Sequence, residues 1–154
     1  MFNELVLAVS LLAQDSIELQ FRSIHQIELT YNKANYLEPA YKTYTGPADP
    51  IKTREKGPSR MVFGYHPYWQ GTKWQNYQYD LLTTIAYFSA EANAAGQLID
   101  LHGWPATDLI NKAHANGVEV VLTVTLFDES DLETLLSNTN NQENLIKNLV
   151  YEVK

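Results

Sequence analysis

The sequence predicts an α/β fold built on parallel strands, and two observations carry this prediction. Strongly apolar segments at 61–65, 81–93 and 118–127 are typical of strands that are covered on both faces of a sheet. Segments with helical periodicity alternate with them, at 105–117 and 130–153. Strands that alternate with helices indicate a parallel sheet with right-handed crossovers.

Each expected strand has its own signal. The first begins at Met61 and ends near Tyr65, where an aromatic loop follows. The second runs through "LLTTIAYFSAEAN", which is β-branched and aromatic at its centre. The third has five β-branched residues between Val120 and Thr125 and little polar alternation, so it is the clearest of the three.

The expected helices are marked by stripes and end signals. In the first, Pro105 suits the opening turn and Gly117 suits a left-handed stop. A capping box, Ser130 with Glu133, marks the second, where neighbouring acidic residues also complement a helix N-terminus. A further apolar stripe follows a break at 137–141, and it comprises Leu145, Ile146, Leu149, Val150 and Val153.

Two parallel architectures fit this order, an open doubly wound sheet and a (β/α)8 TIM barrel. No glycine-rich phosphate turn follows any strand, whereas an aromatic loop follows the first, which favours the barrel and a site at its carboxyl-terminal face. A full barrel needs about 250 residues. The 94 residues from Met61 onward suffice for about three βα units. We therefore expect residues 60–154 to be the N-terminal portion of a truncated barrel.

The first 59 residues divide into two segments. Residues 1–13 contain the apolar run "LVLAVSLLA", which has the length of a signal-peptide core, although no basic residue precedes it and Leu11 is large for its place before a cleavage site. A short helix or strand docked on the domain is the alternative. Residues 14–59 are predicted to be a linker or N-terminal extension, because prolines and glycines cluster after residue 45. This organisation predicts a secreted or cell-envelope protein.

Composition excludes several classes of ligand. The net charge is −7, and the segment 61–154 holds four basic against eleven acidic residues, which disfavours binding to nucleic acid. Cysteine is absent, and the four histidines have no metal-binding spacing, so we expect neither a metal nor another cofactor. No apolar run reaches 18 residues, so no membrane span is expected. A neutral ligand that contacts aromatic side chains fits best.

Three ordered motifs resemble family 18 glycoside hydrolases, the chitinase-like group, and in particular bacterial secreted and spore-peptidoglycan members. "FGYHPYW" at 63–69 is similar to the first barrel strand of that family. "YDLLTTIAYFSAEANAAGQL" at 79–98 resembles the second strand, and "LINKAHANGVEVVLTVTLF" at 109–127 resembles the following helix and third strand. The resemblance covers 61–154.

The resemblance implies hydrolysis of polysaccharides that contain N-acetylglucosamine, such as chitin or peptidoglycan, by a substrate-assisted retaining mechanism. The family's general acid is a glutamate at the end of the fourth strand, which would lie beyond Lys154. The chain alone is therefore expected to be inactive. The Ser-x-Gly-Gly common on the third strand is replaced by Thr123-Val124-Thr125-Leu126, which puts chitin specificity in doubt more than the fold.

The candidate substrate-binding residues lie at the ends of the three strands. By the resemblance, Tyr65 would line the floor of a sugar site and Trp69 its rim, since aromatic faces cover the apolar face of a sugar ring. Packing against neighbouring aromatic residues is the structural alternative, and His66 is a weaker candidate in the same loop. The remaining candidates follow the second and third strands, and they are Phe88, Ser89, Glu91 and Thr125.

Two functions of other classes remain open. One is a chitinase-like carbohydrate-binding protein without the catalytic acid, and the other is an interaction module on an open flavodoxin-like sheet. The open edge strands of a partial barrel also predict self-association of the chain.

Overall fold

The computed structural model describes residues 23–35 and 46–153, which belong to two compact units, Met1–Ala34 and Asn35–Lys154. The first unit contributes α2 (Ile24–Asn35), whose N-terminus is capped by the Ser23 hydroxyl, which accepts from the Gln26 N–H. This helix lies inside the stretch predicted as a linker. The predicted signal segment, residues 1–13, lies outside the described residues.

The second unit is organised around a mixed sheet. β2 (Thr84–Ala92) is central and pairs in parallel with β1 (Phe63–Pro67) and with β4 (Glu119–Thr125). The three predicted strands and their parallel pairing are therefore confirmed. Each observed strand is shorter at its start than the apolar run that marks it, because the first apolar residues of each run still belong to the preceding connection.

A fourth strand, β3 (Leu98–Asp100), was not predicted. It returns antiparallel to the end of β2 through a tight turn, in which the Asn93 side chain accepts from the N–H groups of Ala95 and Gln97. Three residues are too few to show an alternating pattern, so the hairpin has no clear signal in the sequence. The hairpin lengthens β2 beyond the end of β1.

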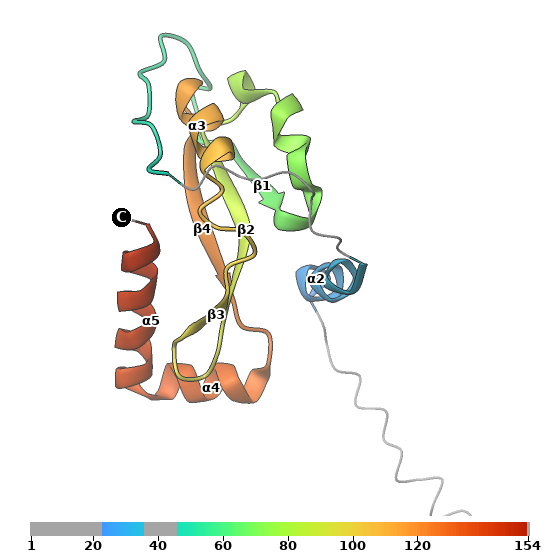
Figure 1. Ribbon diagram of the computed structural model, residues 1–154, viewed down its shortest axis with the longest axis vertical. Helices are drawn as coiled ribbons and strands as arrows, with labels where there is room; N and C mark the ends of the chain where they lie inside the picture. Colours follow the sequence, from blue (N-terminus) through green and yellow to red (C-terminus); the bar gives the residue numbers. More distant parts are fainter. Residues whose placement is uncertain (1–22, 36–45, 154) are drawn as a thin grey trace, which may run out of the picture. The chain divides into compact units, whose positions relative to one another are not determined.

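The connections differ from regular βα units in one place. After β1 the chain forms two 3-10 helices, η1 (Tyr68–Asn76) and η2 (Tyr79–Leu81), instead of an α-helix. The α-helices of this unit are α3 (Thr107–Ala115), α4 (Glu129–Ser137) and α5 (Thr139–Glu152). Figure 1 shows α4 at the carboxyl-terminal end of β4 and α5 running back along the sheet.

The helix ends correct two local predictions. Asp128, and not Ser130, caps α4, because its carboxylate accepts from the Asp131 N–H at 3.0 Å. α3 begins at Thr107, two residues after Pro105, and has no side-chain cap. The predicted break between the last two helices is confirmed at Asn138, whose side chain caps α5. These short polar side chains offer the first-turn N–H groups a partner that the helix itself lacks.

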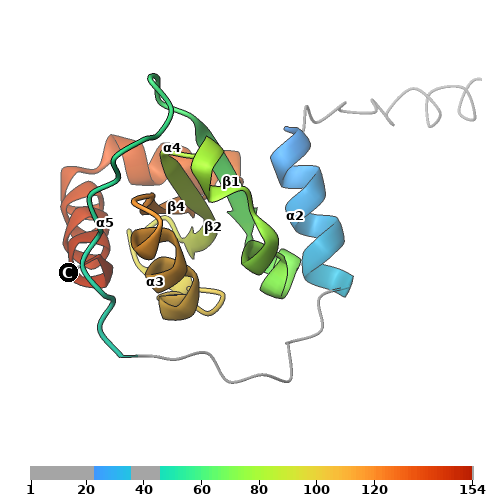
Figure 2. The same cartoon turned by 90° about the horizontal axis from the view of Figure 1, so that it is seen from above.

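The two faces of the sheet have different side chains. On one face the Tyr87 ring contacts the rings of His66 and Trp104. Figures 1 and 2 show α3 over one face of β2 and β4. On the other face the rings of Tyr65 and Phe88 meet, and Phe63 and Val121 remain exposed. The first face forms the core, together with buried apolar residues of α3, among them Leu109, Ile110 and Ala113.

Residues 46–58 form an extended strap at the amino-terminal end of the strands, drawn in teal in Figure 1. The Arg54 guanidinium donates to the carbonyl oxygens of Tyr79 and Leu82, each at 2.9 Å. The Lys52 N–H donates to the His114 carbonyl at the end of α3. This part of the predicted linker is thus attached to the sheet by several hydrogen bonds.

Candidate functional site

An aromatic cluster lies at the carboxyl-terminal end of β1 and β2. Phe88 is at its centre and contacts two rings edge-to-face. The ring centroids of Tyr65 and Trp69 lie 6.3 Å and 5.9 Å from that of Phe88. The structure therefore brings together three of the predicted site residues. Phe88 is buried, Trp69 is half-buried and Tyr65 is 54% exposed, so Tyr65 is the most exposed of the three.

A mostly apolar pocket of about 310 Å³ adjoins Tyr65. It lies beside the start of β2. Gly64 leaves room there for the Leu82 side chain, since a Cβ added at position 64 would lie only 3.1 Å from that side chain. Such a volume is at the low end for small-molecule sites. The remaining lining residues are Tyr77, Gln78, Leu81 and Ile85.

Ser89 and Thr125 form a buried hydroxyl pair. Thr125 donates to the Ala90 carbonyl at 3.2 Å, so the Ser89 hydroxyl is the donor in the 3.0 Å bond between the two side chains. The sheet register shifts between Phe88 and Ala90, which places Ser89 opposite no residue of β4. Ser89 has 0% of its surface exposed, so it cannot contact a ligand at the surface, and its hydroxyl joins β2 to β4.

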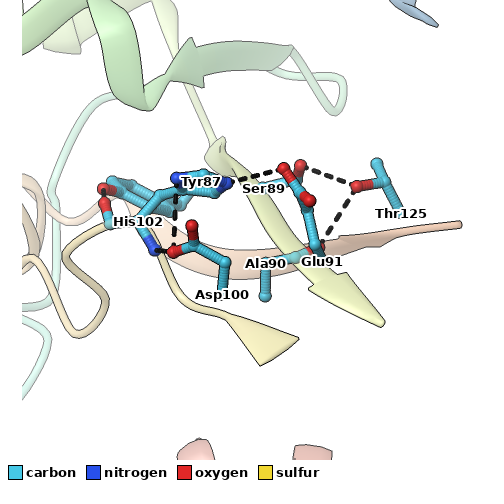
Figure 3. A network of polar contacts seen from close by, with 7 residues as sticks. All are labelled: Tyr87, Ser89, Ala90, Glu91, Asp100, His102 and Thr125. Carbon is cyan, nitrogen blue, oxygen red and sulfur yellow. Dashed lines mark hydrogen bonds and ion pairs between the residues drawn. The ribbon is translucent and has the colours of Figure 1, made fainter. Parts of the chain in front are cut away.

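Glu91 is held by a histidine from the turn after β3. His102 Nε2 lies 2.8 Å from Glu91 Oε1, and Nδ1 lies 3.3 Å from Asp100 Oδ1, so a carboxylate faces each ring nitrogen (Figure 3). The His102 backbone adds two bonds, since its N–H donates to Asp100 and its carbonyl accepts from the Tyr87 hydroxyl. This network was not predicted from the sequence.

His102 also joins this network to the aromatic loop. Its ring stacks on Tyr68 with 3.8 Å between centroids and 3° between planes, and Tyr68 in turn contacts Trp69 edge-on at 4.8 Å. The available signal was the dipeptide His102-Gly103, since histidine is among the residues enriched in left-handed backbone. That signal marks a turn but does not reveal which side chains the ring meets.

His66 is a core residue and not part of the aromatic cluster around Phe88. It is 2% exposed, on the face opposite Tyr65, and its Nδ1 lies 2.9 Å from the Tyr77 hydroxyl. Burial lowers the pKa of His66 to about 4, so the ring is neutral at pH 7. Its weak candidacy as a ligand-binding residue is therefore wrong, because alternation along β1 turns it toward the core.

The described residues offer no metal centre, since no group of three or more His, Asp or Glu side chains among them has suitable geometry.

The acidic run after β4 acts in helix capping: hydrogen bonds from the Asp131 N–H and the Ser130 hydroxyl lower the pKa of Asp128. Within the part of the chain that the structure describes, no helix is long and apolar enough to cross a bilayer.

The chemistry of the site is that of binding. The Ser89 hydroxyl bonds to Thr125 and not to a histidine, so no activated nucleophile is formed there. The aromatic cluster and the Glu91 carboxylate are linked through the rings of Tyr68 and His102. Aromatic faces and a carboxylate acceptor suit a neutral ligand with apolar faces and hydroxyl or amide donors.

Comparison with known proteins agrees with this architecture. No family model matches the chain, and no curated protein matches it. The fold is similar to the crystal structure of a chitinase from Bacteroides thetaiotaomicron, with a TM-score of 0.52 and 16% sequence identity. The match covers 59% of this chain and 30% of that chain. The chain thus has a mixed α/β fold similar to part of the fold of that chitinase.

Proposed function

We propose that this chain is the N-terminal part of a secreted family 18 glycoside hydrolase that acts on polysaccharides containing N-acetylglucosamine. The observation that carries the proposal is the cluster of Tyr65, Trp69 and Phe88 at the carboxyl-terminal ends of parallel strands. The carboxylate of Glu91 is linked to this cluster through the His102 ring and Tyr68. In barrel enzymes of this class, sites lie at that face. The similarity of fold to a chitinase supports the same conclusion.

In this proposal the chain forms one wall of the cleft. The exposed ring of Tyr65 packs on a sugar face, which contributes about 1.5–2 kcal/mol if roughly 60–80 Å² of apolar surface is buried at ~25 cal/mol/Å². Glu91 accepts a hydrogen bond from a hydroxyl or acetamido N–H. The general acid belongs to the strand that follows β4 in the parallel barrel order, which would come after Lys154, and the substrate's acetamido group acts as nucleophile.

Binding by the 154-residue chain tests the saccharide part of the proposal. The chain is titrated with a hexamer of N-acetylglucosamine and with cellohexaose, and binding is followed by calorimetry and by NMR. We expect preference for the acetylated oligomer. Tyr65→Ala should weaken binding about tenfold or more, the value of one stacking platform. Equal binding of both oligomers, or no binding of either, contradicts the proposal.

The matched control is Tyr151→Ala. Tyr151 is also exposed, at 80%, but it lies near the end of α5 and outside the aromatic cluster. Its removal should leave the affinity unchanged. Equal losses in both variants would show that exposed tyrosines bind the oligomer without a defined site.

Hydrolysis separates the enzyme from the alternative, a chitinase-like carbohydrate-binding protein that lacks the acid. The 154-residue chain should release no reducing sugar, and a chain extended by its downstream coding sequence should release it. Binding by the extended chain without hydrolysis would support the alternative. Hydrolysis by the short chain would show that the acid has been placed wrongly.

A further inference from the structure

His102 occupies a backbone conformation that side chains other than glycine seldom adopt. Its φ is +47°, and Gly103 follows with a φ of +84°. A glycine at position 102 would adopt this conformation more easily. An outlier of this kind points to a function for the side chain. Because histidine is itself among the residues enriched in left-handed backbone, the contacts of the imidazole decide whether it has such a role.

The contacts of the ring show what it contributes. One edge meets Glu91 from the end of β2, at 2.8 Å, and one face meets the Tyr68 ring from η1, at 3.8 Å. The side chain is only 8% exposed, so both contacts are shielded from water. The ring thus joins two segments that are distant in sequence and that both carry residues of the proposed cleft.

The same contacts extend to the sugar-facing ring system. Tyr68 lies edge-on to Trp69, and Trp69 lies edge-on to Phe88. On the other side, Asp100 Oδ1 faces Nδ1 of the ring, so the ring cannot rotate without losing its contacts with Asp100 and Glu91 (Figure 3). Asp100 also accepts from the His102 backbone N–H, which holds the turn. A side chain fixed in this way can hold its neighbours in one orientation.

We propose that His102 is a positioning residue for the saccharide site: it orients the Glu91 carboxylate by a hydrogen bond and the Tyr68–Trp69 pair by ring stacking. The inference rests on the proposed function for its ligand, while the positioning itself rests on the contacts alone. His102 touches no ligand in this scheme. It acts by reducing the number of conformations that Glu91 and Trp69 adopt before binding.

Two variants separate the two contacts. His102→Gly removes the whole ring but suits the positive φ, so the turn should persist. His102→Phe keeps a flat ring over Tyr68 and loses the bond to Glu91. His114→Ala is the control, since this histidine lies at the end of α3 next to the strap. All are made in the full chain, with tryptophan replaced by 5-fluorotryptophan and the Trp69 signal assigned with Trp69→Phe.

Affinity for the N-acetylglucosamine hexamer and the fluorine shift of Trp69 without ligand are both measured. We expect His102→Gly to weaken binding about tenfold and to move and broaden the Trp69 signal, with the protein still folded. His102→Phe should keep the Trp69 signal and lose several-fold in affinity. The control should change neither.

The outcomes distinguish this inference from the proposed function. A folded His102→Gly chain with unchanged Trp69 signal and unchanged affinity overturns the positioning role. Should that variant fail to fold, unchanged affinity in a folded His102→Phe overturns the part played by Glu91. Absence of binding in the unsubstituted chain rejects the saccharide function, and the Trp69 signal of the variants still decides whether His102 positions the rings.

Discussion

The two ends of the parallel strands are held by different kinds of interaction. At the amino-terminal end, each hydrogen bond of the strap has a backbone group on at least one side: Arg54 donates to the Tyr79 and Leu82 carbonyls, the Lys52 N–H donates to the His114 carbonyl, and the Asp49 N–H donates to the Asn111 side chain. At the carboxyl-terminal end, side chains contact side chains, as in the pairs of His102 with Glu91 and Ser89 with Thr125. The first arrangement stabilises a fold, whereas the second also fixes the shape of a surface.

This division agrees with the general behaviour of barrel proteins, in which one end serves stability and the other serves function. It predicts that substitutions at the amino-terminal end alter stability without altering ligand affinity. At the carboxyl-terminal end, small substitutions should alter affinity, and only those that meet backbone should greatly alter stability.

The largest effect is expected at Gly96, in the hairpin turn at the carboxyl-terminal end. A Cβ there would lie 2.1 Å from the Asn141 backbone oxygen, and its φ is +74°. Gly96→Ala should lower the free energy of unfolding by about 3 kcal/mol or more, because backbone must move. Urea denaturation measures it. Gly117→Ala, at the other end, meets the Lys52 carbonyl at 2.9 Å with a φ of +67° and should cost less, and the reverse order would contradict the described packing.

A loss of unfolding free energy of similar size is expected when the pH is lowered. Burial lowers the pKa of His66 to about 4 from 6.5, so the unfolded chain binds the proton first as the pH falls. Stability from this residue is complete above pH 6.5 and decreases by about 3 kcal/mol between pH 6.5 and 4. Denaturation curves at pH 7, 5 and 4 should show this slope, and His66→Gln should remove most of it. An equal slope in both chains would mean that another group is responsible.

A smaller loss is expected for Arg54→Ala at the amino-terminal end. The substitution removes two charge-assisted hydrogen bonds to carbonyl oxygens, those of Tyr79 and Leu82, and should cost about 1–3 kcal/mol. Arg54→Lys should recover part of it, since one ammonium cannot satisfy both carbonyls in the same geometry. Oligosaccharide affinity of the folded variant should equal that of the unsubstituted chain. A change in affinity would end the functional distinction between the two ends.

The smallest effect is expected at the cap of α4. Asp128→Ala removes the bond to the Asp131 N–H and should lower the midpoint of thermal or urea denaturation slightly but measurably. Ser130→Ala is the control, because the Ser130 hydroxyl only donates to the Asp128 carboxylate and caps no N–H. A larger loss of stability for Ser130→Ala than for Asp128→Ala would instead support the capping box predicted from the sequence, with Ser130 as the N-cap.

Local patterns in the sequence determined the three parallel strands and the helices α3 to α5, but not β3 or the 3-10 helices. Near-continuous apolar runs marked β1, β2 and β4, and the helical stripes marked α3 to α5, because burial on both faces and 3.6-residue periodicity are local properties. The aromatic residues around Tyr65 could also be identified from the sequence, because they are close together along the chain. Their grouping at one end followed from the rule that parallel strands end on the same side.

Tertiary structure alone decided which side chains meet. His102 reaches Glu91 and Tyr68 because a three-residue strand and a left-handed turn bring it back to β2, and neither has a pattern that a single sequence reveals. The alternation within β1, which exposes Tyr65 and buries His66, required the position of the core. Contacts between distant segments depend on the path of the whole chain, whereas periodicity depends only on neighbours. This is why the long strands and the α-helices of the second unit were predictable and the short strand β3 and the network were not.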